Sequence, residues 1–155
     1  RGKSHVLRVV REVLYHQPKA KRTNLRFALE HLYHILDRSA VIFIISDFLD
    51  HGYEKAFKVL HQKHDLIALQ IIDPRERELP SCGWMELEDG ETGETILVKT
   101  NHRSCRDQYL KTCNQRELET DQIFRRMGVD SVKIIAGTSY ILPLIKFFRL
   151  RENRL

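Results

Sequence analysis

The sequence predicts an α/β protein in which a parallel sheet is covered by helices on both faces. Three short runs, near 40–46, 66–72 and 131–136, are almost wholly apolar and rich in β-branched residues, as is typical of strands buried on both sides. Amphipathic segments of helical length precede and separate these runs. Strand, helix and strand follow one another between residues 40 and 72, which is the order of a right-handed βαβ unit. We therefore expect the three strands to point in the same direction.

Two helices are expected before the first strand, over 5–16 and about 24–37. Apolar residues recur in each at the spacing of one helical face. Pro18 ends the first helix and opens a basic loop. Thr23 stands where the second helix needs an N-cap, which is one explanation of its presence.

Two further helices follow the first and the last strand. Residues 52–63 form the first of them, with Asp50 placed as its N-cap. Residues 140–151 form the other. The turn at 137–139 contains a glycine, a threonine and a serine, which favours capping of this helix over binding of an anion.

An insertion separates the second and third strands. The segment near 84–99 surrounds an Asp89-Gly90 turn, which is typical of a β-hairpin. A long polar helix is expected from about 102 to 127. No repeat or internal linker interrupts the chain, so we interpret residues 1–155 as a single domain.

The net charge of +5 is unevenly distributed along the chain. Residues 1–38 hold nine Lys and Arg against three Asp and Glu, whereas residues 73–100 hold three against eight. A basic amino-terminal segment could contact phosphates or an acidic protein, but a solvated helix face explains it more simply. Because the middle segment is acidic, we expect no nucleic-acid partner.

Cys82, Cys105 and Cys113 show no zinc-ligand spacing, and the eight histidines show none either. Thiols without such a pattern indicate reduced cysteines and a cytoplasmic protein. No apolar stretch approaches the roughly 18 to 20 residues that a membrane span needs. The chain begins with Arg1 and has no signal peptide, so we expect a processed product or a piece of a longer protein.

Three aspartates stand at the carboxyl ends of the first two strands. Asp47 and Asp50 follow the first strand, and Asp73 follows the second. Because ligands of parallel sheets bind at this edge, Asp47 is the first candidate site residue, with Asp50 and Asp73 as further candidate carboxylates. Each also has a structural explanation, which is helix capping for Asp47 and Asp50 and turn formation before a proline for Asp73.

Four segments taken together resemble a known family. They are Arg22-Thr23-Asn24-Leu25, Ile45-Ser46-Asp47-Phe48-Leu49-Asp50, Asp73-Pro74-Arg75-Glu76-Arg77-Glu78-Leu79-Pro80 and Asp89-Gly90-Glu91-Thr92-Gly93-Glu94. They resemble the carboxy-terminal part of the bacterial family named domain of unknown function fifty-eight, a von Willebrand factor type A-like domain. The resemblance covers essentially the whole chain, and residues 73–80 are its most specific part.

The resemblance implies a Rossmann-like three-layer domain whose upper sheet edge can hold Mg²⁺ or Mn²⁺ in a metal ion-dependent adhesion site. It places metal ligands at Thr23 and Asp47, whose hard oxygen atoms suit these cations. The Asp-x-Ser-x-Ser loop that completes such a site does not occur in the 155 residues, and Arg22 brings a positive charge close to Thr23. We therefore expect this fragment to hold no metal by itself.

The missing loop is explained if the chain is a domain fragment that lacks the first strands of the full fold. The strand at 40–46 would then have lost its neighbour and would expose an apolar edge. We expect this edge to pair with another copy of the chain or to be covered in another way.

The first functional hypothesis is a non-enzymatic protein-interaction module. The resemblance implies work with a MoxR-type AAA+ ATPase in complex assembly, on the cytoplasmic side of the membrane where the parent protein carries membrane segments. The alternative is a divalent-metal-dependent phosphohydrolase or nuclease that uses Asp47, Asp50 and Asp73, with basic residues of 1–26 holding phosphates. It ranks second because no Lys, His or Glu is positioned as its general base.

Overall fold

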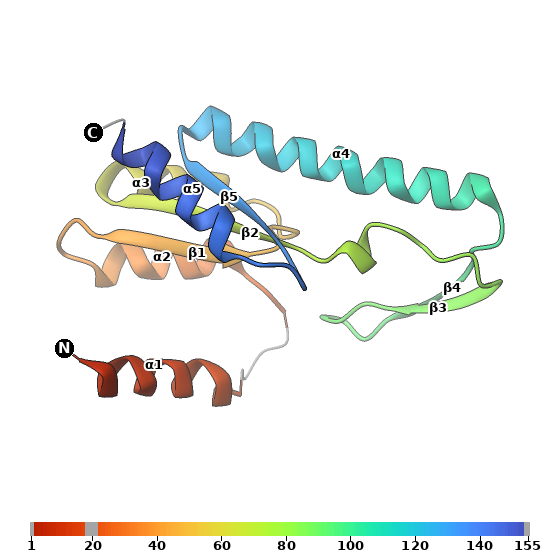
Figure 1. Cartoon of the computed structure of the whole chain (residues 1–155), viewed down its shortest axis with the longest axis horizontal. Helices are drawn as coiled ribbons and strands as arrows, with labels where there is room; N and C mark the ends of the chain where they lie inside the picture. Colours follow the sequence, from red (N-terminus) through yellow and green to blue (C-terminus); the bar gives the residue numbers. More distant parts are fainter. Residues whose placement is uncertain (1, 18–21, 154–155) are drawn as a thin grey trace.

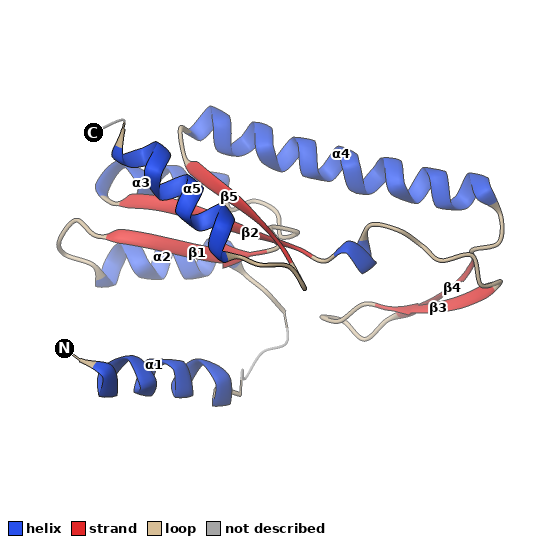
Figure 2. Ribbon diagram, in the orientation of Figure 1, coloured by secondary structure: helices blue, strands red, loops and turns tan. Residues whose placement is uncertain are grey.

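The computed structural model describes residues 2–17 and 22–153 and has the predicted α/β fold (Figures 1 and 2). A three-stranded sheet contains β1 (Val41–Ser46), β2 (Asp65–Ile72) and β5 (Asp130–Ile135) in the order β1-β2-β5. Both neighbouring pairs are parallel, which confirms that the three predicted strands run in one direction. Their predicted bounds agree with the structure to within about one residue.

Helices cover the two faces of the sheet because β2 carries apolar side chains on both sides. On one face lie α2 (Leu25–Ile35) and α3 (Glu54–Lys63). On the other face lies α5 (Ile141–Glu152). Figure 2 shows α5 in front of the strands and α2 behind them. This three-layer arrangement is that of a Rossmann-like fold.

The larger of two hydrophobic cores lies on the α2 and α3 face. Its buried members are Leu29, Ile44, Phe48, Tyr53, Phe57, Leu60, Leu66, Ala68, Phe124 and Val129. Four of these residues are aromatic, and their ring centroids lie 4.9 to 6.2 Å apart. Full burial of such a side chain stabilises a fold by about 1.5–3 kcal/mol. The cluster therefore fixes the positions of the loops at the carboxyl edge of the sheet.

The insertion between β2 and β5 contains the predicted hairpin and long helix. β3 (Trp84–Glu88) and β4 (Thr95–Lys99) pair in antiparallel register. α4 (Arg103–Met127) runs from the hairpin back to the sheet, where Phe124 enters the larger core (Figure 1). A short 3-10 helix, η1 (Pro74–Glu76), is an addition to the predicted elements. Neither α4 nor any other helix among the described residues is long and apolar enough to cross a membrane.

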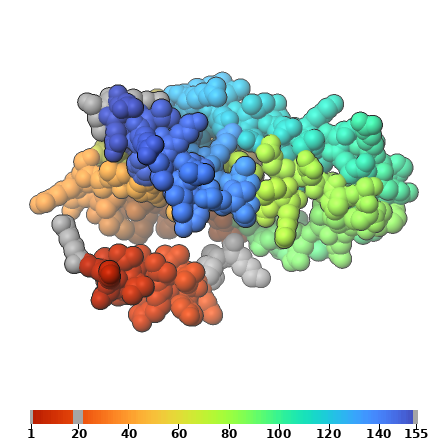
Figure 3. Space-filling view, viewed as in Figure 1, coloured from red at the N-terminus to blue at the C-terminus, as the bar shows by residue number. Residues whose placement is uncertain are grey.

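The amino-terminal helix α1 (Lys3–Tyr15) contributes nothing to either core. None of its residues is buried, and its apolar stripe is exposed. Figure 3 shows it at the periphery of the molecule. Residues 18–21, which include Pro18 and most of the predicted basic loop, lie outside the described residues.

β1 forms an edge of the sheet, and the side chains on one of its faces are exposed. Val41 is 58% exposed and Ile45 is 66% exposed, although both are β-branched residues of a parallel strand. Among the described residues β1 pairs only with β2. Parallel strands are normally covered on both faces. The exposed apolar side chains of β1 are therefore unusual for this class of sheet.

The prediction that Thr23 caps the second helix is wrong. The N-cap of α2 is Asn24, whose side chain accepts a hydrogen bond from the backbone N–H of Phe27 at 2.8 Å. Asparagine is at least as effective an N-cap as threonine, and here it stands one position closer to the helix. Thr23 is thus free of the structural role that the sequence had offered for it.

Two other predicted caps are also wrong. α3 begins after Tyr53 without a side-chain cap, because Asp50 lies too far before its first turn. α5 begins after Tyr140, again without a side-chain cap. The hydroxyl of Thr138 instead donates to the carbonyl oxygen of Ile135 at 2.8 Å, so the turn at the end of β5 satisfies its own backbone.

Candidate functional site

The carboxyl ends of β1 and β2 meet at one edge of the sheet, and the three predicted aspartates lie there. Asp47 and Asp50 are in the loop after β1, and Asp73 directly follows β2. The two strands are parallel and end side by side, with Ser46 opposite Gln70. The structure therefore places all three carboxylates on loops at the same edge.

A cleft of about 770 Å³ opens at this edge, between the two loops, the hairpin tip and α4. We call it the acidic cleft. Its carboxylates are Asp47, Asp50, Glu54, Asp73, Glu76, Asp89, Glu91, Glu117 and Glu119. Three side chains that can carry a positive charge also line the cleft, namely Arg77, Arg116 and His51. The excess of carboxylates favours cations and basic partners over anions.

The loop after β1 has an unusual backbone conformation at Phe48. Its φ is 59°, in the left-handed region that bulky residues rarely adopt. The ring of Phe48 is buried, 4.9 Å from that of Phe124 between centroids, and this packing holds the residue in place. As a result Asp47 and Leu49, on either side of it, are both exposed.

The aspartates already accept hydrogen bonds from backbone N–H groups. Oδ1 of Asp47 accepts from Leu49 N at 3.1 Å, within its own loop. Oδ2 of Asp50 accepts from Leu25 N at 2.7 Å, so Asp50 stabilises the start of α2 and not that of α3. Asp73 uses one oxygen to cap η1. Within the described chain, the second oxygen of Asp47 and that of Asp73 carry no hydrogen bond, and they remain available to a ligand.

Thr23 lies on the border of the same cleft. Its backbone N–H donates to Oε1 of Glu91 at 3.1 Å, which joins the start of α2 to the hairpin tip. Its hydroxyl forms no hydrogen bond with the described residues. The structure thus brings the two residues implied as metal ligands, Thr23 and Asp47, to one cleft, each with a free oxygen atom.

The carboxylates around Glu76 influence one another electrostatically. Burial raises the pKa of Glu76, and the charges of Asp73 and Asp47 raise it further. They do not form a chelating group, however. Across residues 2–17 and 22–153, no three His, Cys, Asp or Glu side chains lie together in a way that could hold a metal ion.

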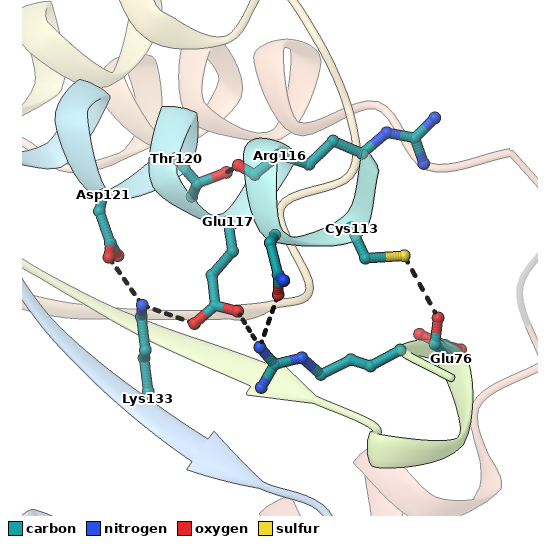
Figure 4. A network of polar contacts seen from close by, with 9 residues as sticks. Glu76, Cys113, Arg116, Glu117, Thr120, Asp121 and Lys133 are labelled. Carbon is teal, nitrogen blue, oxygen red and sulfur yellow. Dashed lines mark hydrogen bonds and ion pairs between the residues drawn. The ribbon is translucent and has the colours of Figure 1, made fainter. Parts of the chain in front are cut away.

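α4 forms one wall of the acidic cleft, and an ion-pair network fixes it to the sheet (Figure 4). Lys133 of β5 donates to Glu117 at 2.8 Å and to Asp121 at 2.7 Å. Arg77 pairs with Glu117 at 3.0 Å. Arg116 points away from this network in Figure 4. The charge of Arg77 is therefore largely balanced by Glu117.

The sequence reasoning missed two deeply buried polar residues that line the cleft, Gln70 and Tyr53. Gln70 did have a signal, since it is the only polar residue between Leu66 and Ile72. Tyr53 had none, because a tyrosine at the start of an amphipathic helix is an ordinary core residue. The contribution of α4 to the cleft was also missed, because its polar surface shows no distinctive pattern.

A family model described as a protein of unknown function, DUF58, matches residues 1–119 of the chain. The chain belongs to the DUF58 family. This membership confirms the family resemblance that the four sequence segments indicate. No solved structure matches the DUF58 chain significantly.

Several mycobacterial proteins are similar to the DUF58 chain. It is 27% identical over 137 residues to the uncharacterized protein MAV169 of Mycobacterium avium, with 88% of this chain and 80% of the relative covered. It is 22% identical over 155 residues to the uncharacterized proteins Rv1480 of Mycobacterium tuberculosis and Mb1516 of Mycobacterium bovis. Those alignments cover 98% of this chain and 49% of each relative, so the chain spans about half the length of these two proteins.

Proposed function

We propose that this DUF58 chain is a non-enzymatic protein-interaction module of von Willebrand A type, and that its partner binds at the acidic cleft. The observation that carries the proposal is the position of the cleft. It lies at the carboxyl edge of a parallel sheet, where ligands of such sheets usually bind. The lining is rich in charged residues, as expected of a surface that recognises a specific partner.

A divalent cation is part of this proposal. The hydroxyl of Thr23 and the second carboxylate oxygen of Asp47 are hard donors of the kind that Mg²⁺ and Mn²⁺ prefer. These donors are of the right chemical type for such a cation, but they are too few. Among the described residues, no three His, Cys, Asp or Glu side chains lie together in a way that could hold a metal ion. We therefore assign the cation to the longer protein, where an Asp-x-Ser-x-Ser loop would complete the site. The bound cation would offer a coordination position to an oxygen of the partner.

We propose a MoxR-type AAA+ ATPase as the partner, with complex assembly as the process and the cytoplasm, or the cytoplasmic side of the membrane, as the location. The family resemblance supports this choice of partner. The acidic cleft supports a protein partner more generally, because a charged concave surface can both steer and orient a docking protein.

The proposal is tested by immobilising the longer protein and measuring binding of a MoxR-type ATPase with Mg²⁺ and with EDTA. Binding should require Mg²⁺, and Asp47→Ala should weaken it by about tenfold or more. Glu152→Ala is the matched control, because it also removes a carboxylate, and Glu152 is exposed on α5 and does not line the cleft. Equal binding by the parent protein and Asp47→Ala would rule out the cation site.

The phosphohydrolase or nuclease alternative has less support. Of the basic segment over 1–26, the described residues 2–17 contribute nothing to the cleft. The nine carboxylates would repel a phosphodiester. Hydrolysis of a phosphodiester with Mn²⁺ that is abolished by Asp47→Ala would reverse this ranking.

A further inference from the structure

Two of the most deeply buried residues in the acidic cleft are polar and have no hydrogen-bond partner. Gln70 of β2 is 5% exposed, and Tyr53 before α3 is 1% exposed. Neither side chain forms a hydrogen bond with any residue in the described part of the chain. The polar atoms of both side chains reach the space of the cleft, because the fully enclosed side-chain atoms that lack a partner among the described residues belong to His61, His64 and Arg151. They are therefore open to water, an ion or a ligand in the cleft.

The neighbours of Gln70 do not provide that partner. Its register neighbours are Ser46 on β1 and Lys133 on β5. The ammonium group of Lys133 is already bound to Glu117 and Asp121 on α4. The amide of Gln70 therefore lines the cleft with its hydrogen-bonding capacity unused.

The surroundings of Tyr53 are acidic. Its pKa is raised to about 12, mainly by burial and then by the charges of Glu54 and Asp50. The phenol is therefore neutral at physiological pH, and its oxygen can accept as well as donate a hydrogen bond. The carboxylates of Glu54 and Asp50 are close enough to add a negative potential at this oxygen.

The cationic groups of the cleft leave most of this negative charge unbalanced. Arg77 pairs with Glu117, and Arg116 extends away from the network in Figure 4. His51 is exposed on the loop after β1. The cleft thus combines unused acceptors in its interior with an excess of carboxylates around them, which is complementary to a group that is cationic and has only donors.

We infer that the acidic cleft receives an arginine side chain of the partner protein, with the oxygens of Gln70 and Tyr53 accepting hydrogen bonds from its guanidinium group. A guanidinium has five N–H donors and no acceptor. Asp73 and Glu76 balance its charge. Phenylalanine, leucine and isoleucine side chains in the lining contact its aliphatic stem. The protein origin of this arginine rests on the proposed function, whereas the arginine site itself does not depend on a bound cation.

The test is a titration of the ¹⁵N-labelled chain with the peptide acetyl-Ala-Arg-Ala-amide in EDTA, followed by nuclear magnetic resonance. The side-chain amide signals of Gln70 should shift as the peptide binds. A second peptide carries citrulline in place of arginine, which keeps the shape and removes the charge. It should bind about fivefold more weakly or worse, because charge-assisted hydrogen bonds are roughly twice as strong as neutral ones.

Two variants and one control locate the site. Tyr53→Phe removes a single hydroxyl, and Glu76→Gln removes a single charge. Each should weaken binding of the arginine peptide by about threefold to fivefold. Glu152→Gln makes the same chemical change outside the cleft and should leave binding unchanged. The ¹⁵N spectrum of each variant also reports whether it is folded.

Three results would overturn the inference. They are an unchanged Gln70 side-chain signal, equal binding of the arginine and citrulline peptides, and tighter binding of a lysine peptide than of the arginine peptide. Because this titration uses neither Mg²⁺ nor an ATPase, its failure would leave the Mg²⁺-dependent binding of the longer protein intact. Arginine binding without ATPase binding would instead contradict only the proposed partner.

Discussion

Phe48 links the backbone of the candidate site to the hydrophobic core. Its left-handed conformation turns Asp47 towards solvent, and its buried ring keeps that turn in place. A left-handed conformation costs a residue with a side chain roughly 1–2 kcal/mol. The core must therefore compensate for strain that is located at the functional edge, as is common at binding sites.

Substitutions of Phe48 can separate these two effects. Phe48→Ala should lower the free energy of unfolding by about 3–5 kcal/mol, because it leaves a cavity beside Phe124. Phe48→Gly leaves a similar cavity but has no penalty for positive φ, so it should be about 1 kcal/mol more stable than Phe48→Ala. Urea unfolding followed by circular dichroism measures both. An alanine variant that is more stable than the glycine variant would show that the backbone here is unstrained.

Tyr53 makes the free energy of unfolding depend on pH in the alkaline range. Its pKa is about 12 in the folded chain, above the ordinary value of 10.0, because burial and two nearby carboxylates oppose its ionisation. The contribution of the neutral phenol to stability is therefore complete below about pH 10 and is lost as the pH rises through about 12. Tyr53→Phe has no ionising group at this position. Its stability relative to the parent chain should rise above pH 10 in denaturant titrations, and a pH-independent difference would contradict the assignment.

At the scale of elements, the position of α4 depends on the network that joins it to the sheet. Lys133 contacts two carboxylates of α4, and Arg77 contacts one of them. Lys133→Met would leave the charges of Glu117 and Asp121 facing β5 without their main counter-ion. Since these groups are partly exposed, we expect a loss of about 1–2 kcal/mol, between the values for surface and buried pairs.

The matched control for this prediction is Lys111→Met, on the exposed surface of the same helix. It should change the free energy of unfolding by less than about 0.5 kcal/mol. Thermal or urea unfolding of the two variants measures both changes in the free energy of unfolding. Equal effects would mean that the network of Lys133 adds nothing to the stability.

The elements of this fold could be predicted well from the sequence, because each has a local physical cause. The β-branched runs at 40–46, 66–72 and 131–136 form strands, and the amphipathic segments form helices, with bounds close to those expected. Caps were less predictable. Asn24 and Thr23 are both suitable caps, and only the geometry of the chain decides between them.

The candidate site could be predicted only in part. Asp47 and Asp73 were found because strand ends of a parallel sheet meet at one edge. Asp50 was also found, but its contact with Leu25 joins residues 25 positions apart, which no local pattern reveals. The same holds for Tyr53, whose place in the cleft depends on how α3, the sheet and α4 pack together.

At the scale of the whole molecule, two apolar surfaces lack cover within the described residues. One is the stripe of α1, which contains no buried residue. The other is the outward face of β1, where Val41 and Ile45 are exposed beside an unpaired strand edge. Edges of this kind are prone to pair with other chains. We therefore propose that the isolated chain self-associates through β1.

Ile45→Lys tests this proposal, because a charge on an edge strand opposes pairing. Light scattering after size-exclusion chromatography should show the parent chain shifting towards a dimer with rising concentration, while Ile45→Lys stays monomeric. Leu97→Lys, at an equally exposed position on β4, is the control and should still dimerise.

In a two-fold dimer the two β1 strands would meet antiparallel, each presenting the same residues to the other. One lysine per chain would then place two charges in the interface, so a single substitution should suffice, and a parent chain that is monomeric at every concentration would exclude pairing through β1.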